Sequence, residues 1–213
     1  TAVRLSCAHA LFKYLIAQKT IIEGKKAPLF PGAFAIYGHG NVACLGQAME
    51  EFQSDLPGYR GHHEQSMALS GVGYARAMRR KQIFIATSSS GPGAMNMVTA
   101  AGVALSNRLP LLLLPGDVFA SRFPDPVLQQ VENFNSPVEN QNDAFKPVSR
   151  YFDRITRPEQ ILSSLPQAIH VMLDPAECGP ATLSMSQDVQ GEVYLSLIHI
   201  SEPTRLGMIS YAV

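Results

Sequence analysis

The sequence has 213 residues, and its 17 lysines and arginines are balanced by 17 aspartates and glutamates. A chain with no net charge gives no basis for binding nucleic acid or an anionic membrane surface. The longest aliphatic run, residues 109–115, is much too short to cross a bilayer. The length predicts one good-sized α/β domain with its own core, and 46% hydrophobic against 16% charged residues suits a surface partly covered by another subunit.

The cysteines are odd in number and far apart, at Cys7, Cys44 and Cys178. They lack the paired spacing of a metal site, and the six histidines form no zinc signature, so we expect free thiols and no metal ligands. The first residues carry no apolar signal core, so secretion is not indicated. The predicted compartment is a reducing cytoplasm.

The first predicted helix begins after Ser6, a suitable N-cap, and runs to about residue 18. A loop rich in proline and glycine is expected at 25–32, and a short strand at 34–37. Gly38, Gly40 and Asn41 follow that strand directly. A glycine-rich turn after a strand allows a ligand to approach the backbone closely.

This segment, Gly-His-Gly-Asn-Val-Ala, also fits the pattern G-x-G-x-x-A of nicotinamide dinucleotide-binding domains. An oxidoreductase of that class is therefore an alternative. However, no second strand ending in an acidic ribose-binding residue follows at the usual distance. Glu50, Glu51 and Asp55 fall instead on a helix and its exit.

Glu64 begins a predicted helix. Apolar residues follow it at helical spacing: Met67, Ala68, Leu69, Val72, Gly73 and Ala75. Because the chain enters the core here, we expect the Glu64 carboxyl to be buried and its pKa to be raised. The alternative is a first-turn acid favoured only by the helix dipole.

A buried strand is predicted at 83–87, followed by Gly91, Pro92 and Gly93 and then by Asn96. Two glycines around a proline let the backbone approach a ligand, and the next helix start offers free N–H groups. Taken alone, an ordinary strand-to-helix turn has the same sequence pattern.

The remaining elements alternate between helix and strand. We expect a helix to about 106, a strand buried on both faces at 111–114, and a functional or disordered loop at 117–142. A helix capped by Thr156, with Glu159 in the capping-box position, should run to about 173, before a last strand at 179–185. This alternation predicts a doubly wound parallel sheet flanked by helices.

Together, His63-Glu64-Gln65 and residues 87–96 resemble the pyrimidine-binding domain of thiamine diphosphate enzymes. In that family a His-Glu-Gln-like segment is followed, after a helix and a strand, by Thr-Ser-Gly-Pro-Gly-Ala-x-Asn. The resemblance implies that Glu64 hydrogen-bonds the aminopyrimidine ring of thiamine diphosphate and favours its imino tautomer, while the carbanion chemistry belongs to the cofactor. The residues implied to shape the pyrimidine pocket are Gly38, Gly40, Asn41, Gly91, Pro92, Gly93 and Asn96.

Further segments resemble one branch of this family, hydrolases that break a C–C bond in a cyclic 1,2-diketone derived from inositol. The segments are 28–32, 35–42, 112–120, 124–132 and 174–180. The block Pro-Asp-Pro-Val-Leu-Gln-Gln is distinctive, because acetolactate synthases differ there. The resemblance implies that Gln130 and His63 face the substrate, although the branch more often has asparagine at position 63. An acetolactate synthase-like carboligase is an alternative, and so is a non-catalytic interaction module, which would have no use for Glu64.

The resemblance covers residues 5–194, so we predict a pyrimidine-binding domain at 1–194. Residues 195–213 read as two pieces of a translated sequencing adapter in one frame, and we exclude them; on propensity alone, 194–200 would be a strand. In the family, Mg²⁺ and the diphosphate are held by a separate domain with a Gly-Asp-Gly…Asn-Asn motif, which this sequence lacks. The resemblance therefore implies an inactive fragment of an enzyme that acts on a small-molecule substrate, with an active site completed by another copy of the subunit.

Overall fold

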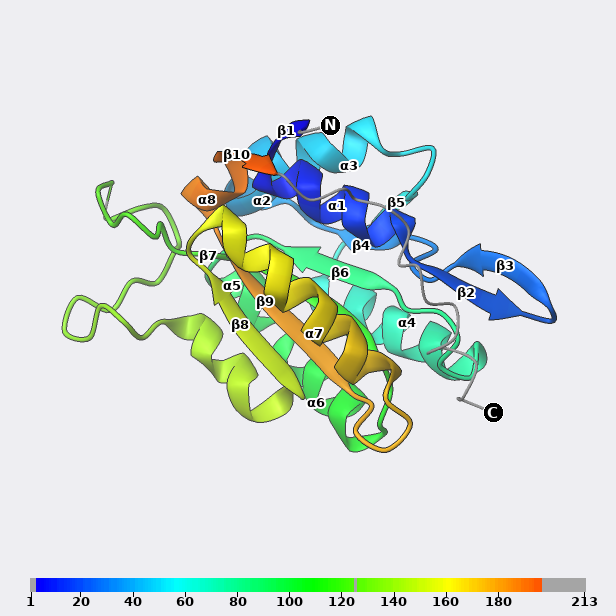
Figure 1. Cartoon of the computed structure of the whole chain (residues 1–213). Helices are drawn as coiled ribbons and strands as arrows, with labels where there is room; N and C mark the ends of the chain where they lie inside the picture. Colours follow the sequence, from blue (N-terminus) through cyan, green and yellow to red (C-terminus); the bar gives the residue numbers. More distant parts are fainter. Residues whose placement is uncertain (1–2, 125, 197–213) are drawn as a thin grey trace.

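The computed structural model describes residues 3–124 and 126–196. Its centre is a six-stranded sheet in the order β5-β4-β6-β7-β9-β8, and every neighbouring pair in it is parallel (Figure 1). The strands are β4 (Ala33–Ala35), β5 (Gly58–Arg60), β6 (Ile85–Ser88), β7 (Leu111–Asp117), β8 (Tyr151–Ile155) and β9 (Pro180–Ser186). The predicted doubly wound parallel sheet is confirmed.

Helices cover both faces of this sheet (Figure 1). They are α1 (Cys7–Ala17), α2 (Gly38–Asn41), α3 (Gln47–Glu51), α4 (Glu64–Ala77), α5 (Pro92–Met95), α6 (Val98–Ser106), α7 (Ile161–Leu173) and α8 (Gln187–Gly191). A π-helical turn, η1 (Val42–Gly46), joins α2 to α3, and two 3₁₀ segments are η2 (Gln141–Val148) and η3 (Pro158–Gln160). The sheet with its helices on either side forms three layers.

Two hydrophobic cores lie on the opposite faces of the sheet. One core contains buried residues of α1, α3 and α7, and the other contains those of α4 and α6. Strand β7 contributes to both, because Leu112 and Leu114 pack in the first core while Leu111 and Leu113 pack in the second. Successive side chains of a strand point to opposite faces, which explains the all-apolar run.

The start of the chain confirms one prediction and corrects another. Ser6 caps α1 by accepting a hydrogen bond from the His9 backbone N–H. The loop expected at 25–32 is wrong in its first half, because β2 (Lys19–Ile22) and β3 (Lys25–Pro28) form an antiparallel hairpin. Glu23 and Gly24 both have positive φ, as a two-residue hairpin turn requires. The hairpin extends from the body of the domain, so its strands lack a clear apolar pattern (Figure 1).

Near residue 156 the predicted helix start is wrong by one residue. Arg157 is the N-cap of η3, and the Gln160 side chain accepts the backbone N–H groups of Thr156 and Arg157, so Glu159 is not the capping acid. Strand β8, directly before this cap, was not predicted. Its five residues include Asp153 and Arg154, which break the apolar pattern of a buried strand.

The termini of the described chain pair with each other. Strand β1 (Val3–Ser6) runs antiparallel to β10 (Val193–Ser196). This pairing includes Leu195 and Ser196, the first two residues of the predicted adapter segment, and 197–213 lie outside the described residues. The adapter interpretation and the domain limit at 194 stay predictions. No helix within the described ranges is long and apolar enough to span a membrane.

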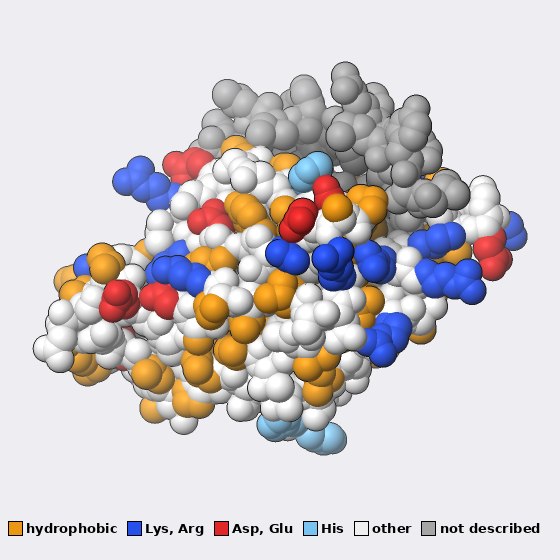
Figure 2. Space-filling model, turned by 90° about the horizontal axis from the view of Figure 1, so that it is seen from below, with side chains coloured by type: hydrophobic (Ala, Val, Ile, Leu, Met, Phe, Trp, Pro, Cys, Tyr) orange, Lys and Arg blue, Asp and Glu red, His pale blue; other side chains and the backbone are white. Residues whose placement is uncertain are grey.

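The segment between β7 and η2, residues 118–140, projects from the carboxyl end of the sheet (Figure 1). We call it the β7–η2 loop, and it confirms the long loop expected in this region. Figure 2 shows apolar side chains at the surface of the face seen from below. On this loop the exposed large apolar residues are Phe123, Leu128, Val131, Phe134 and Val138. The loop therefore presents unusually much apolar surface to solvent.

Candidate active site

Two glycine-containing turns meet between β4 and β6, where the order in which strands are added to the sheet reverses. After β4 the chain passes outward to β5, and after β6 it passes to β7 on the other side. In open parallel sheets of this kind, ligands bind outside the carboxyl ends of the strands at such a switch point. The first glycine turn is α2 (Gly38–Asn41), which follows β4, and the second glycine turn is residues 90–93, which follow β6 and Ser89. The topology therefore places both predicted turns at one candidate site.

Glu64 lies against the second glycine turn. It is the first residue of α4, and its Oε2 accepts a hydrogen bond of 2.9 Å from Nδ2 of Asn96. A Cβ added to Gly93 would lie 3.1 Å from Glu64 Oε1, so any larger residue there would crowd this oxygen. Gly91 has φ 67°, a left-handed conformation that favours glycine, and it turns the chain into α5. The structure thus brings Glu64, Gly93 and Asn96 together.

Glu64 is less buried than the sequence predicted. The helical stripe behind it is buried at Met67, Ala68, Val72 and Ala75, but Glu64 itself is half-buried. Side chains of a helix lean toward its N-terminus, so the side chain of the first residue leans away from the core. His63, the residue before it, is exposed in an extended conformation. Its predicted substrate contact stays a prediction.

Ser89 joins the two glycine turns. Its Oγ accepts a 3.3 Å hydrogen bond from the Gly40 backbone N–H. A Cβ added to Gly38 would overlap the Ser89 side chain, and one added to Gly93 would lie 3.4 Å from Ser89 Cβ. Ser89 therefore occupies the space between the turns. In the sequence, the only signal for this contact is the run of three serines before Gly91.

Asn41 is the last residue of the first glycine turn and links this turn to the neighbouring strands. It is almost fully buried, and its Nδ2 donates to Thr87 Oγ1 at 2.8 Å and to the carbonyl oxygens of Ser88 and Leu114. Its Oδ1 accepts from Gln190 of α8 at 2.9 Å. One amide thus ties the turn after β4 to β6 and β7. Asn41 can shape the site by holding this turn in place.

The β7–η2 loop reaches both turns through Gln129 and Gln130. A Cβ on Gly91 would overlap the carbonyl oxygen of Gln129, so this part of the loop lies directly on the second turn. Gln130 is fully buried, and its Oε1 accepts from the Phe119 N–H at 3.3 Å while its Nε2 donates to Gln187 at 2.9 Å. The predicted contact between Gln130 and the substrate stays a prediction.

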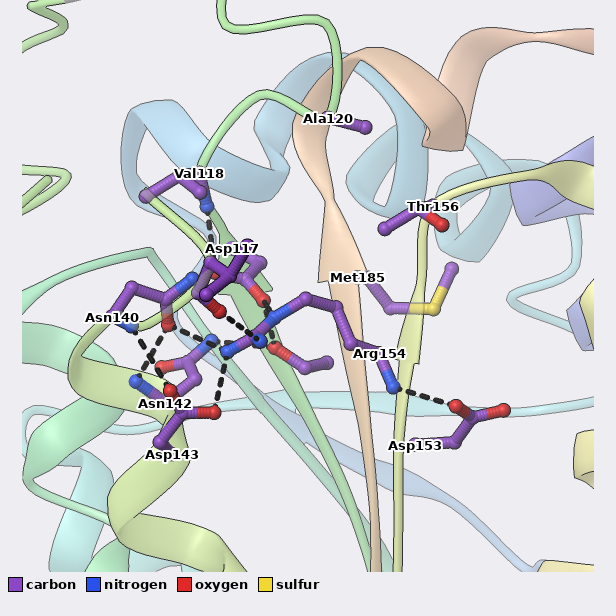
Figure 3. Close-up of polar contacts among 12 residues, drawn as sticks. Asp117, Val118, Ala120, Asn140, Asn142, Asp143, Asp153, Arg154, Thr156 and Met185 are labelled. Carbon is purple, nitrogen blue, oxygen red and sulfur yellow. Dashed lines mark hydrogen bonds and ion pairs between the residues drawn. The ribbon is translucent and has the colours of Figure 1, made fainter. Parts of the chain in front are cut away.

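An ionic cluster holds the base of the same loop (Figure 3). Arg154 of β8 pairs with Asp117, the last residue of β7, at 2.8 Å and with Asp143 at 2.9 Å. It also donates to the Asn140 side chain and to the Val138 carbonyl oxygen. Arg154 therefore binds groups from the start and from the end of the loop, and closes it at its base.

Burial and charge act in opposite directions on this cluster. Burial by itself would lower the pKa of Arg154, but Asp117 and Asp143 raise it above its ordinary value. Burial likewise would raise the pKa of Asp143, but hydrogen bonds from Lys146 and Asn140 and the charge of Arg154 together hold it below its usual range. Asp117 is fully buried and also accepts hydrogen bonds from Ser184 and from the Val118 N–H. The charged forms of Arg154 and Asp143 are thus favoured.

Comparison with known proteins finds a family that matches the part of the chain containing the glycine turns. Residues 32–136, which include both glycine turns and Glu64, match the family described as thiamine pyrophosphate enzyme, N-terminal TPP binding domain. Over these residues the chain is similar to that family.

The chain is also similar to several bacterial proteins that share one name. The chain is 53% identical over 192 residues to the 3D-(3,5/4)-trihydroxycyclohexane-1,2-dione hydrolase of Bacillus subtilis (strain 168). It is 50% identical to the protein of that name from Clostridium tetani (strain Massachusetts / E88) and 48% identical to that from Listeria monocytogenes serotype 4b (strain F2365). Each match covers 90% of this chain and 30% of the relative. The chain thus spans about a third of the length of these relatives.

Proposed function

We propose that this chain forms the pyrimidine-binding part of a thiamine diphosphate-dependent hydrolase that opens 3D-(3,5/4)-trihydroxycyclohexane-1,2-dione, the inositol-derived cyclic diketone. The observation that carries the proposal is the placement of Glu64. Its Oε1 lies beside Gly93 and its Oε2 is held by Asn96, next to the two glycine turns. Similarity to hydrolases of that name supports the substrate.

The residues at the site fit a flat, uncharged heteroaromatic ring. Asn96 fixes one carboxylate oxygen of Glu64 and leaves the other directed at the second glycine turn, where a side chain in place of Gly93 would intrude. Glu64 would hydrogen-bond the aminopyrimidine ring, and both glycine turns would line it. When bound, the cofactor supplies a stabilised carbanion for breaking the C–C bond. The part of Glu64 is to orient the ring and hold a proton at one of its nitrogens.

The rest of the active centre lies outside this chain in our proposal. A second domain would bind the diphosphate with Mg²⁺, and another copy of the subunit would complete the site. Free Cys7, Cys44 and Cys178 suit a reducing cytoplasm, which we propose as the compartment. The nicotinamide alternative is weakened because β5, the strand after the first glycine turn, ends at Arg60 and not at an acid that could bind a ribose.

A chimera tests the proposal. In the Bacillus subtilis relative, the segment aligned with this chain is replaced by the corresponding residues of this chain, without 195–213. We expect the chimera to open trihydroxycyclohexane-1,2-dione only when thiamine diphosphate and Mg²⁺ are present. Formation of acetolactate from pyruvate in place of ring opening would favour the carboligase. Binding of a nicotinamide dinucleotide to the chain itself would favour the oxidoreductase.

A further inference from the structure

We infer that Gln130 is a positioning residue, which fixes the β7–η2 loop to the first glycine turn by way of Gln187. The two glutamine side chains form a continuous connection. Gln130 donates to Gln187 Oε1 at 2.9 Å, and Gln187 in turn donates to the carbonyl oxygen of His39 at 3.0 Å. His39 lies between Gly38 and Gly40, so the connection ends inside the turn.

The other end of the connection is equally well defined. Gln130 is fully buried, and its Oε1 accepts the backbone N–H of Phe119, near the start of the loop. Next to Gln187, the carboxylate of Asp188 accepts the N–H groups of Ala120 and Ser121 at 2.9 and 3.0 Å. The start of α8 therefore holds the loop at two places. A buried amide with both ends hydrogen-bonded is costly to leave unpaired, which keeps this arrangement in place.

The loop also bears on the second glycine turn, through the Gln129 carbonyl oxygen against Gly91. Because Gln129 and Gln130 are adjacent, anchoring one sets the position of the other. A displaced loop would therefore release both turns together. For Gln130 to contact a substrate directly, its amide would have to leave two partners, so its position favours action through Gln187.

The first test measures amide hydrogen exchange in this chain, with no cofactor. The reporters are the Gly40 and Asn41 N–H groups, which donate to Ser89 Oγ and to the Tyr37 carbonyl oxygen. With Gln130→Ala we expect their exchange to rise roughly threefold to tenfold, about the value of one hydrogen bond. The matched control is Gln129→Ala, whose side chain is exposed and whose backbone carbonyl is retained.

A double-mutant cycle makes this test specific. Gln187→Ala should accelerate the same two amides, and it is the gentler variant should Gln130→Ala unfold the chain, because Gln187 is only half-buried. Adding Gln130→Ala to it should have little further effect, since both substitutions break the same connection. If Gln187→Ala leaves the exchange of Gly40 and Asn41 at the wild-type rate, the inference is wrong. Fully additive effects of the two substitutions would also refute it.

A second readout separates positioning from general loss of structure, and this readout rests on the proposed function. In the chimera, Gln130→Ala should weaken thiamine diphosphate binding roughly threefold to tenfold, with kcat at saturating cofactor nearly unchanged. A raised substrate KM with unaltered cofactor affinity would instead show direct substrate contact and overturn the inference. If the chimera binds no thiamine diphosphate at all, the proposed function fails, whereas the exchange experiment still decides the role of Gln130.

Discussion

The carboxyl edge of the sheet carries two polar clusters of different chemistry. Beyond β7 and β8, the ionic cluster of Arg154, Asp117 and Asp143 closes the base of the β7–η2 loop. Around the first glycine turn, side-chain amides hold the chain segments together. We call Asn41, Gln130, Gln187 and Gln190 the amide cluster. The ionic cluster therefore ties chain segments together through charged side chains. The amide cluster ties segments together through neutral side chains, around the turns proposed to face an uncharged ring.

This difference has a physical reason. A buried charge needs a partner of opposite charge, whereas a buried amide is satisfied by hydrogen bonds alone. Amides hold backbone without adding a net charge. The two clusters should therefore respond differently to substitution and to pH, and substitutions of Arg154, Asn41 and Asp143 test this.

The largest loss of stability is expected from Arg154→Met. It leaves Asp117, which is fully buried, without its cation, and removal of one partner of a buried ion pair costs about 3–5 kcal/mol. Urea unfolding of the chain measures this loss. The control Arg157→Met, at an exposed arginine three residues along, should change the free energy of unfolding little. A loss below about 1 kcal/mol would mean that the ionic cluster contributes nothing beyond an exposed pair.

Asn41→Ala should come next, with a loss of about 2–3 kcal/mol, because a buried amide that makes several hydrogen bonds leaves its partners unpaired. Since Asn41 does not titrate, this loss should be the same at about pH 7 and at about pH 4. Asn135→Ala, at an exposed position on the loop, serves as the control. Equal unfolding midpoints for the two variants would contradict the role given to Asn41.

Asp143→Asn should cost about 1 kcal/mol near neutral pH, since Asp143 is only partly buried and one of its partners, Lys146, is largely exposed. The pKa of Asp143 is lower in the folded than in the unfolded chain. Its contribution is therefore present above the unfolded pKa, near about 4, and is lost as the pH falls through the folded value.

Urea unfolding across this range measures the difference between wild type and Asp143→Asn. The difference should shrink below about pH 4. The exposed Asp55→Asn is the control and should show no such trend. If the difference in the free energy of unfolding grew as the pH fell, ionised Asp143 would not stabilise the fold as we expect.

The smallest effect on stability is expected for Glu64→Gln. The side chain is half-buried, and a glutamine Oε can still accept the hydrogen bond from Asn96, so the change should stay within about 0.5 kcal/mol. Thermal unfolding of the two proteins provides the comparison. A large destabilisation would show Glu64 to be a structural residue of the α4 terminus.

The sequence predicted those features of this edge that depend on residues close together in the chain. The parallel sheet followed from the alternating pattern, and both glycine turns and Glu64 followed from their positions beside predicted strands and helices. The hairpin of β2 and β3 was missed because its strands project from the core and lack the apolar alternation on which strand prediction depends.

The clusters themselves could not be predicted from the sequence. Gln130 and Gln187 are 57 residues apart, and Asp117 and Arg154 are 37 apart. Only the strand order brings each pair together, and the strand order cannot be predicted from the periodicity of apolar residues. Glu64 was expected to lie deeper than it does, because the apolar stripe behind it says nothing about the direction of the first side chain.

The central claim, that Glu64 activates thiamine diphosphate, is tested most directly by proton exchange at C2 of the cofactor bound to the chimera. Glu64→Gln should slow this exchange roughly 100-fold or more, as expected for loss of a positioned acid–base group. Glu159→Gln, at an exposed first-turn acid of another helical segment, should leave it unchanged. Exchange at the wild-type rate in Glu64→Gln would contradict the account.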